Sequence, residues 1–171
     1  KSVKAIVVMT DSKNMIDLKL SNGIEVLCYE DFIDKKTIEF DWPNLDEKTA
    51  SSLCYTSGTT GNPKGVLYTH RSTVLHAYGI NLKDAIPYGA KDVVMPVVPM
   101  FHVNAWGTPY AAAMCGTKFV FPGAKLDGES LTDLMNQEKV TISLGVPTVW
   151  LLLLNHLRDS GKKLDLSLIH I

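Results

Sequence analysis

Residues 55–65 read YTSGTTGNPKG and connect two predicted strands, residues 52–56 and 66–69. This stretch holds three glycines, four serine or threonine hydroxyls and one lysine. Glycine permits positive φ and close approach to a ligand, and successive N–H groups in a turn form a concave anion site. The hydroxyls add donors and the lysine adds a mobile cation. The stretch therefore predicts an anion-binding loop, with a glycine-rich surface turn as the alternative.

The loop departs from two common nucleotide-binding patterns. A Walker A loop ends in Gly-Lys followed by Ser or Thr, whereas here Pro63 precedes Lys64 and Gly65 follows it. The glycines fall at positions 58, 61 and 65, which does not fit Gly-x-Gly-x-x-Gly. The loop is therefore neither a P-loop nor a dinucleotide-binding turn.

Outward from the loop, short apolar runs alternate with segments of helical spacing, a pattern typical of βαβ units. The predicted strands are residues 3–9, 52–56, 66–69, 93–98, 118–121 and 140–144. The predicted helices are residues 70–86, 127–138 and 146–160. The fold class is α/β, with a predominantly parallel or mixed sheet and covering helices. Because most strand runs are continuously apolar, we expect strands that are covered on both faces.

Composition excludes several classes of protein. The chain has 171 residues, a formal net charge of −1, 46% hydrophobic residues and 20% charged residues, which excludes disorder, collagen and coiled coil. No lysine or arginine stripe is present, so no nucleic-acid partner is expected. The longest dense apolar run, residues 149–154, is too short for a transmembrane segment. Three widely spaced cysteines, Cys28, Cys54 and Cys115, predict reduced, buried thiols rather than a zinc site.

The two ends of the chain carry weaker signals. Residues 11–48 are more polar and contain turn signals, which predicts a connecting region or a covering layer. Residues 164–171 begin like another strand and then stop, which favours a truncated domain. No signal-peptide pattern is present at the N-terminus.

The loop resembles the phosphate-binding signature of the adenylate-forming (acyl-activating, AMP-binding) superfamily, which includes acyl-CoA synthetases, luciferases and the adenylation domains of peptide synthetases. Residues 99–107, PMFHVNAWG, resemble the second family motif in the version typical of medium- and long-chain fatty acyl-CoA synthetases. Residues 145–150, GVPTVW, resemble the stretch that follows in the same branch. The resemblance extends along nearly the whole chain.

The resemblance implies a fatty acid-CoA ligase that uses ATP, Mg²⁺ and CoA. A carboxylate attacks the α-phosphate of ATP to give acyl-AMP, and a thiol then displaces AMP. By analogy, Thr56 would help to position Mg²⁺ and Lys64 would add positive charge. The residues expected to wrap the β- and γ-phosphates are Ser57, Gly58, Thr59, Thr60 and Gly61.

His102 and Trp106 are the candidate residues of the second motif. The resemblance places His102 between the acyl carboxylate and the phosphates, as a catalytic residue, although a packed structural histidine is the alternative. It suggests Trp106 as a gate to a fatty-acyl tunnel, with a plain core residue as the alternative. If a helix started at Asn104, Trp106 would lie on the same face as His102. The small residues Gly107, Ala111, Ala112 and Ala113 would leave room for an apolar tail or permit close helix packing.

The later motifs of the family are absent from these residues. The chain is therefore expected to be a partial N-terminal AMP-binding domain, with residues 1–50 connecting or covering, 51–69 carrying the loop and its strands, and 70–171 carrying βα units and the acyl-site motif. The C-terminal domain is absent, so the chain alone should not complete the reaction. We expect a cytoplasmic location, with peripheral membrane association left open, and the resemblance leaves a homodimer of the complete parent open. The rivals are adenylation of another acid (aromatic or short sulfur-containing), or for another acceptor such as a carrier protein, and a non-catalytic nucleotide-binding module.

Overall fold

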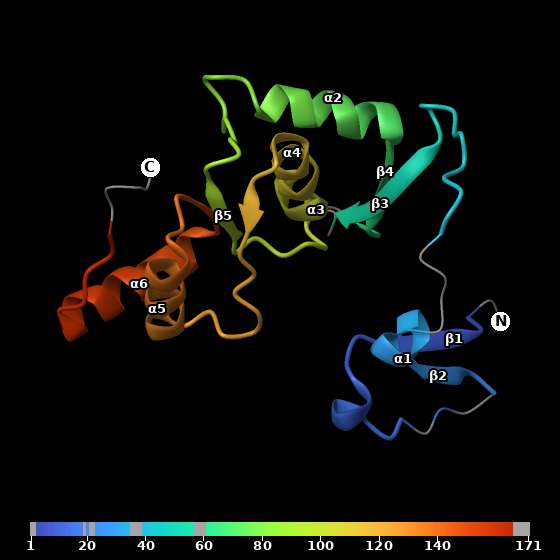
Figure 1. The fold of residues 1–171 in the computed structure, drawn as a ribbon, viewed down its shortest axis with the longest axis horizontal. Coiled ribbons are helices and arrows are strands. Elements are labelled where there is room, and N and C mark those ends of the chain that lie inside the picture. The colour runs from blue at the N-terminus through green and yellow to red at the C-terminus, as the bar shows by residue number, and fades with distance from the viewer. Residues whose placement is uncertain (1–2, 19, 21–22, 35–38, 57–60, 166–171) are drawn as a thin grey trace. The chain divides into compact units, whose positions relative to one another are not determined.

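The structure is a computed structural model that describes residues 3–18, 20, 23–34, 39–56 and 61–165. These residues form two compact units, Lys1–Asn44 and Leu45–Ile171. In the first unit, strand β1 (Ala5–Val8) pairs in parallel with β2 (Glu25–Cys28), and the short helices η1 (Ser12–Asn14) and α1 (Tyr29–Asp34) follow the two strands (Figure 1). The sequence predicts neither β2 nor α1.

The second unit begins with an antiparallel hairpin of β3 (Ala50–Thr56) and β4 (Lys64–Thr69). A separate sheet has the strand order β6-β5-β7, and both of its pairings are parallel. Its strands are β5 (Val93–Pro96), β6 (Lys118–Phe119) and β7 (Ile142–Leu144). The helices of this unit are α2 (His70–Ile80), α3 (Val103–Trp106), α4 (Thr108–Cys115), α5 (Gly128–Glu138) and α6 (Pro147–Ser160). The predicted α/β class, with a predominantly parallel sheet and covering helices, is confirmed, and the β3–β4 hairpin is a separate antiparallel sheet.

Strand β5 is the centre of the core because its alternate side chains enter two different clusters. Val94 packs in a cluster with Ala77 of α2 and Ala111 of α4. Met95 packs in a cluster with Leu131 of α5 and Leu153 of α6. Figure 1 shows α2 lying across α4, and α5 lying beside α6. The expected coverage on both faces is therefore confirmed for β5.

The β3–β4 hairpin does not show this coverage. Leu53 and Leu67 face each other across the hairpin and are 53% and 61% exposed. Alternation along a strand puts these two side chains on the opposite face from Ser52 and Cys54. The prediction of two covered faces is wrong for this hairpin within the described residues, because Leu53 and Leu67 leave one of its faces largely exposed.

Helix α2 starts where the sequence predicts and ends earlier. Thr69 caps its first turn through a reciprocal capping box with Ser72. The helix ends at Ile80 rather than at residue 86. Asn81 instead donates its side-chain amide to the Ala111 carbonyl and accepts the Tyr88 N–H. Pro87 also disfavours helical backbone at the residue before it.

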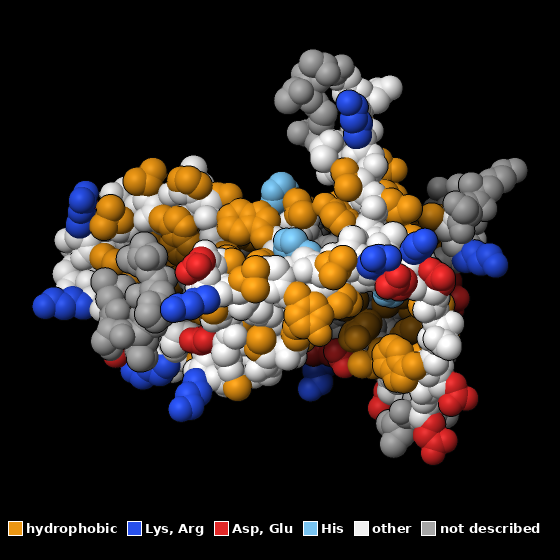
Figure 2. Space-filling model, turned by 90° about the horizontal axis from the view of Figure 1, so that it is seen from above, with side chains coloured by type: hydrophobic (Ala, Val, Ile, Leu, Met, Phe, Trp, Pro, Cys, Tyr) orange, Lys and Arg blue, Asp and Glu red, His pale blue; other side chains and the backbone are white. Residues whose placement is uncertain are grey.

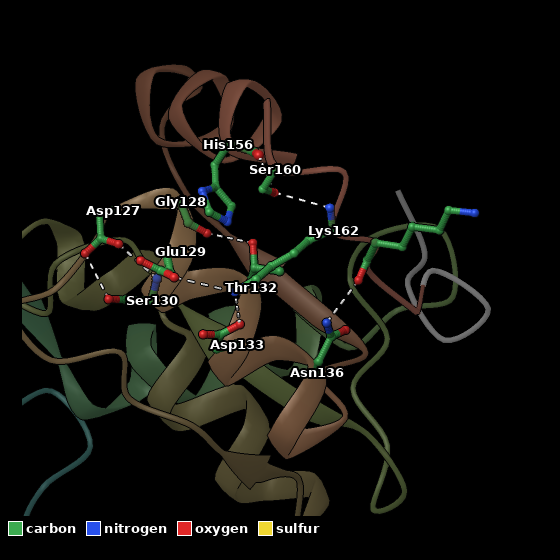
Figure 3. Close-up of polar contacts among 11 residues, drawn as sticks. Asp127, Gly128, Glu129, Ser130, Thr132, Asp133, Asn136, His156, Ser160 and Lys162 are labelled. Atoms are coloured by element: carbon green, nitrogen blue, oxygen red, sulfur yellow. Dashed lines mark hydrogen bonds and ion pairs between the residues drawn. The ribbon is translucent and has the colours of Figure 1, made fainter. Parts of the chain in front are cut away.

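Helices α5 and α6 are joined by polar contacts at their ends (Figure 3). Asp127 caps α5 by accepting the Ser130 N–H at 2.9 Å, and hydrogen bonds from Ser130 hold the pKa of Asp127 below its usual value. Lys162 Nζ lies 2.9 Å from Asp133 Oδ1 and 3.6 Å from Glu129 Oε1. The hydrogen bond to Asp133 raises the pKa of Lys162. The helix pair predicted at residues 127–138 and 146–160 is confirmed.

Gly128 lies at a close approach of α5 to α6. A Cβ atom there would lie 2.4 Å from His156 Cβ and 2.8 Å from the Leu152 carbonyl oxygen. Gly128→Ala should therefore destabilise the protein by about 1–3 kcal/mol, measured by urea denaturation. Gly79→Ala is the matched control, because no atom lies within 4 Å of that Cβ and α2 should gain about 0.5–1 kcal/mol. If Gly128→Ala and Gly79→Ala had the same urea midpoint, the close contact of Gly128 with α6 would be refuted.

Hydrophobic side chains remain exposed over much of the face that Figure 2 shows. The exposed hydrophobic residues of the second unit include Leu75, Tyr78 and Leu82 on or just after α2, and Leu151 and Leu152 on α6. Within the described part of the chain, no helix has the length and apolar character required to cross a bilayer.

Candidate functional site

The hairpin holds the two ends of the glycine-rich loop side by side. Thr56, the last residue of β3, pairs directly with Lys64, the first residue of β4. Directly opposed residues of an antiparallel pair project to one face, with Cβ atoms about 4.5–5.5 Å apart. Both side chains are exposed. A hydroxyl and a cation therefore stand together where the loop leaves and re-enters the sheet.

The loop itself is only partly described. The candidate phosphate-binding residues Ser57, Gly58, Thr59 and Thr60 lie outside the described residues. Gly61 is described, is exposed, and has φ +150°, which is a conformation that favours glycine. The roles expected for all of these residues stay predictions.

The second motif meets the hairpin on the face that carries Thr56 and Lys64. Asn104 Nδ2 donates to Ser52 Oγ at 3.0 Å, and Cys54 Sγ donates to Asn104 Oδ1 at 3.7 Å. Ser52, Cys54 and Thr56 alternate along β3 and so share one face of the strand. The structure therefore brings the strand that leads into the loop together with the predicted acyl-site motif.

The backbone of the second motif forms a left-handed turn. The φ angles of Val103, Asn104, Ala105 and Trp106 are 49°, 51°, 49° and 57°, and Gly107 follows at 74°. Left-handed backbone costs about 1–2 kcal/mol for each residue with a side chain. The turn is closed by hydrogen bonds from the Ala105 N–H to His102 O and from the Gly107 N–H to Asn104 O. The suggested right-handed helix from Asn104 is wrong, so helical spacing does not relate His102 to Trp106.

His102 and Trp106 lie at the two ends of this turn. His102 is exposed, and its backbone N–H donates to the Pro99 carbonyl at 3.0 Å. The Trp106 side chain is 37% exposed, whereas Ala105 beside it is fully buried. These exposures favour accessible groups over packed core residues, and the catalytic and gating roles stay predictions.

The small residues after the turn serve helix packing. Ala111 and Ala112 are fully buried in the cluster that also holds Ala77 of α2. Ala113 is exposed. Gly107 is buried, and a Cβ atom there would lie 2.5 Å from His76 Nδ1. Of the two explanations for these small side chains, close approach of α4 to α2 is the one that the contacts support.

A cavity of about 300 Å³ adjoins the turn. Its walls come from the hairpin, from α2, from the turn and from α4. The lining residues are Tyr68, Ser72, Thr73, His76, Val103, Asn104, Gly107 and Tyr110. The cavity thus opens beside the same turn that carries the two candidate residues, and its volume is at the lower end of the range usual for small-molecule sites.

The described residues fit only part of a magnesium site. Mg²⁺ in nucleotide sites takes oxygen ligands from water, from phosphates and from one or two carboxylates. The Thr56 hydroxyl suits one such position. Among the residues that the structure describes, no group of three or more His, Cys, Asp or Glu side chains could hold a metal ion. Phosphate oxygens and groups outside these residues would have to supply the other ligands.

Sequence reasoning missed Asn104 and Ser52, which join the two motifs. The Cys54 thiol, which was predicted to be buried, is only partly buried and donates to Asn104 Oδ1. All three cysteines are free, but only Cys28 is buried. Asn and Gly within residues 102–107 were the available signal for positive φ, because both tolerate the left-handed region.

Comparison with known proteins agrees with this arrangement. The sequence profile of the AMP-binding enzyme family matches residues 2–170. The chain belongs to the AMP-binding enzyme family. The AMP-binding chain is 63% identical over 137 residues to the 3-methylmercaptopropionyl-CoA ligase of Ruegeria pomeroyi. This alignment covers 80% of this chain and 25% of that protein. It is 52% identical over 161 residues to the medium-chain-fatty-acid-CoA ligase of Ectopseudomonas oleovorans. This second alignment covers 94% of this chain and 29% of that protein.

A solved structure shares the fold of this AMP-binding chain. The long-chain-fatty-acid-CoA ligase of Archaeoglobus fulgidus superposes with a TM-score of 0.73 and 25% identity, over 86% of this chain and 31% of that chain. The chain therefore spans between 25% and 31% of the length of these three relatives.

Proposed function

We propose that this chain forms part of an ATP-dependent acyl-CoA ligase, in which it binds the nucleotide phosphates and the carboxylate. The observation that carries the proposal is the bond between the two motifs: Asn104 ties the turn to β3 on the face where Thr56 and Lys64 stand together. Relatives named as CoA ligases, at 52% and 63% identity, support the same activity. We also propose that the chain is the partial N-terminal domain expected from the sequence.

The reaction brings an anion towards a polyanion. A carboxylate oxygen attacks the α-phosphorus of ATP, the bond from that phosphorus to the bridging oxygen breaks, and pyrophosphate leaves. The thiolate of CoA then attacks the acyl carbonyl, and AMP leaves with the oxygen of the broken acyl bond. Positioning and charge neutralisation are the main requirements of the first step.

The residues of this chain suit those requirements. Lys64 supplies a cation at the mouth of the loop, and the Thr56 hydroxyl beside it supplies an oxygen. Mg²⁺, when bound with ATP, neutralises phosphate charge. His102 precedes the turn and is accessible, so its imidazole can donate a hydrogen bond that orients the carboxylate. The loop between Thr56 and Lys64 supplies backbone N–H donors for the phosphates.

The acid is proposed to be aliphatic. A medium-chain fatty acid and 3-methylmercaptopropionate are the two candidates, and the 63% identity to a ligase named for the second favours the shorter, sulfur-containing acid. Both candidates have an unbranched apolar chain, which could pack against Val103 and the rings of Tyr68 and Tyr110 in the cavity beside the turn. A cytoplasmic location is proposed as well, because the three thiols are unpaired.

Thioester formation tests the activity and separates the two acids. The protein that contains this chain is incubated with ATP, Mg²⁺, CoA and one acid of a graded series: 3-methylmercaptopropionate, octanoate or palmitate. Mass spectrometry should detect an acyl-CoA that depends on ATP. The highest kcat/KM should fall on one of the two shorter acids. If no acid gave a thioester, the proposed function would be wrong.

Trp106→Ala tests the gate. Loss of a partly exposed indole from the end of the turn should change the kcat/KM ratio of octanoate to 3-methylmercaptopropionate by about tenfold, the effect expected when an apolar contact distinguishes chain lengths. The KM for ATP should stay the same. An equal loss for both acids would instead assign Trp106 to the core.

A further inference from the structure

The left-handed turn at residues 103–106 needs an external restraint. Backbone of this hand is unfavourable for residues with side chains, and it persists only where the surroundings hold it. Val103, Ala105 and Trp106 have no preference for it, whereas Asn104 tolerates it better than most residues. The hydrogen bonds within the turn, from Ala105 to His102 and from Gly107 to Asn104, do not fix where the turn lies relative to the hairpin.

The side chain of Asn104 supplies that restraint. Its amide nitrogen donates to Ser52 Oγ at 3.0 Å, and its oxygen accepts from Cys54 Sγ at 3.7 Å. Both contacts are partly buried and span about fifty positions of the sequence. Because both ends of one carboxamide are engaged by the same strand, the contact fixes an orientation as well as a position.

The residues on either side of Asn104 are those that the proposed chemistry uses. His102 precedes it by two residues and Trp106 follows it by two. Along β3, the face that contacts Asn104 continues to Thr56, which opposes Lys64. Among the described residues, the Asn104 carboxamide therefore fixes the position of the turn relative to strand β3, which leads to the phosphate loop.

We infer that Asn104 is a positioning residue: its carboxamide, held by Ser52 and Cys54, sets His102 and Trp106 relative to Thr56 and Lys64. This inference rests on the proposed ligase function. It gives Asn104 no contact with the reacting atoms. It predicts that loss of the carboxamide misplaces the carboxylate relative to the α-phosphorus and leaves ATP binding nearly unchanged.

Three substitutions separate the carboxamide from the backbone. Asn104→Gly removes the carboxamide and adopts positive φ freely, whereas Asn104→Ala removes it and adds backbone strain. Ser52→Ala removes the partner and leaves the turn sequence intact. Ser51→Ala is the matched control, since Ser51 bonds Tyr68 O and Thr73 Oγ1 instead of Asn104. All four are made in the complete ligase, and melting temperature is measured for each.

The readout is carboxylate-dependent pyrophosphate release. Asn104→Gly and Ser52→Ala should each lower kcat by about 10- to 100-fold, the loss that a displacement of about 1 Å can cause. The KM for ATP should change by less than about threefold, because the phosphate loop is untouched. The double variant should lose no more than Asn104→Gly alone, since Ser52→Ala removes only a contact that Asn104→Gly has already broken. Ser51→Ala should keep the wild-type kcat.

The outcomes distinguish this inference from its alternatives. If Asn104→Gly were fully active while Asn104→Ala was impaired, residue 104 would matter only for its backbone, and the inference would be wrong. A lower melting temperature with unchanged kcat would assign Asn104 to stability alone and would also overturn it. If the wild-type ligase released no pyrophosphate with any acid, the proposed function would fail together with the inference.

Discussion

Lys64→Met is expected to lower kcat/KM for ATP by about 10²- to 10³-fold, the usual effect of removing one preorganised donor that stabilises transition-state charge. Lys64 is the first residue of β4 and stands directly opposite Thr56 at the mouth of the loop. Methionine keeps much of the length of the side chain and removes only the cation. Steady-state pyrophosphate release with varied ATP measures the effect.

The control for Lys64→Met is Lys125→Met, which makes the same change of charge. Lys125 is exposed and lies between β6 and α5. This control should keep its activity, and both variants should melt within a few degrees of the wild type, because exposed positions change stability by only about 0.5 kcal/mol. Equal activity of Lys64→Met and wild type would remove Lys64 from the phosphate site.

Gly107→Ala should cause a large loss of stability, because the added methyl group meets both an unfavourable backbone conformation and a neighbouring side chain. Gly107 has φ +74°, and its added Cβ would lie 2.5 Å from His76 Nδ1 and 2.6 Å from His76 Cε1. The left-handed backbone costs about 1–2 kcal/mol, and overpacking costs about 1–3 kcal/mol more. We expect a loss of roughly 2–5 kcal/mol in the free energy of unfolding, measured by urea denaturation.

A second substitution separates the two contributions. The double variant His76→Ala/Gly107→Ala lacks the imidazole. Relative to His76→Ala, its only remaining loss of stability should be the cost of left-handed backbone at residue 107. The double variant should therefore be more stable than the sum of the two single changes predicts, by about the overpacking contribution. Strict additivity would show that His76 does not contact the methyl group. If Gly107→Ala alone unfolded at the wild-type midpoint, the left-handed conformation of residue 107 would be contradicted.

Helices α2, α5 and α6 were predictable because their signals are local, whereas α1 and α4 were not predicted. Thr69 and Asp127 are capping residues followed three positions later by a serine, and Gly161 is a left-handed C-cap after α6. The strand predicted at residues 93–98 is a continuous apolar run, and the core confirms that β5 is covered on both faces. At these positions, the secondary structure favoured by the local sequence is the one that the packed core contains.

The missed features depend on contacts between distant residues. Asn104 and Gly107 tolerate positive φ, but Val103, Ala105 and Trp106 do not favour it, and the turn is held by Ser52 and Cys54 from another element. The end of α2 at Ile80 depends on a bond from Asn81 to Ala111. Strand β2, only four residues long and opened by Glu25, forms through parallel pairing with β1. Tertiary contacts decide each of these cases.

Exchange of labelled pyrophosphate into ATP, measured without CoA, tests most directly whether this chain belongs to an enzyme that adenylates a carboxylate. The reverse of the first step restores ATP from acyl-AMP and pyrophosphate, so exchange requires the acid and no thiol. The proposed function predicts exchange with 3-methylmercaptopropionate or octanoate, none without an acid, and a large loss in Lys64→Met. Absence of exchange with every acid, or equal exchange with and without an acid, would contradict it.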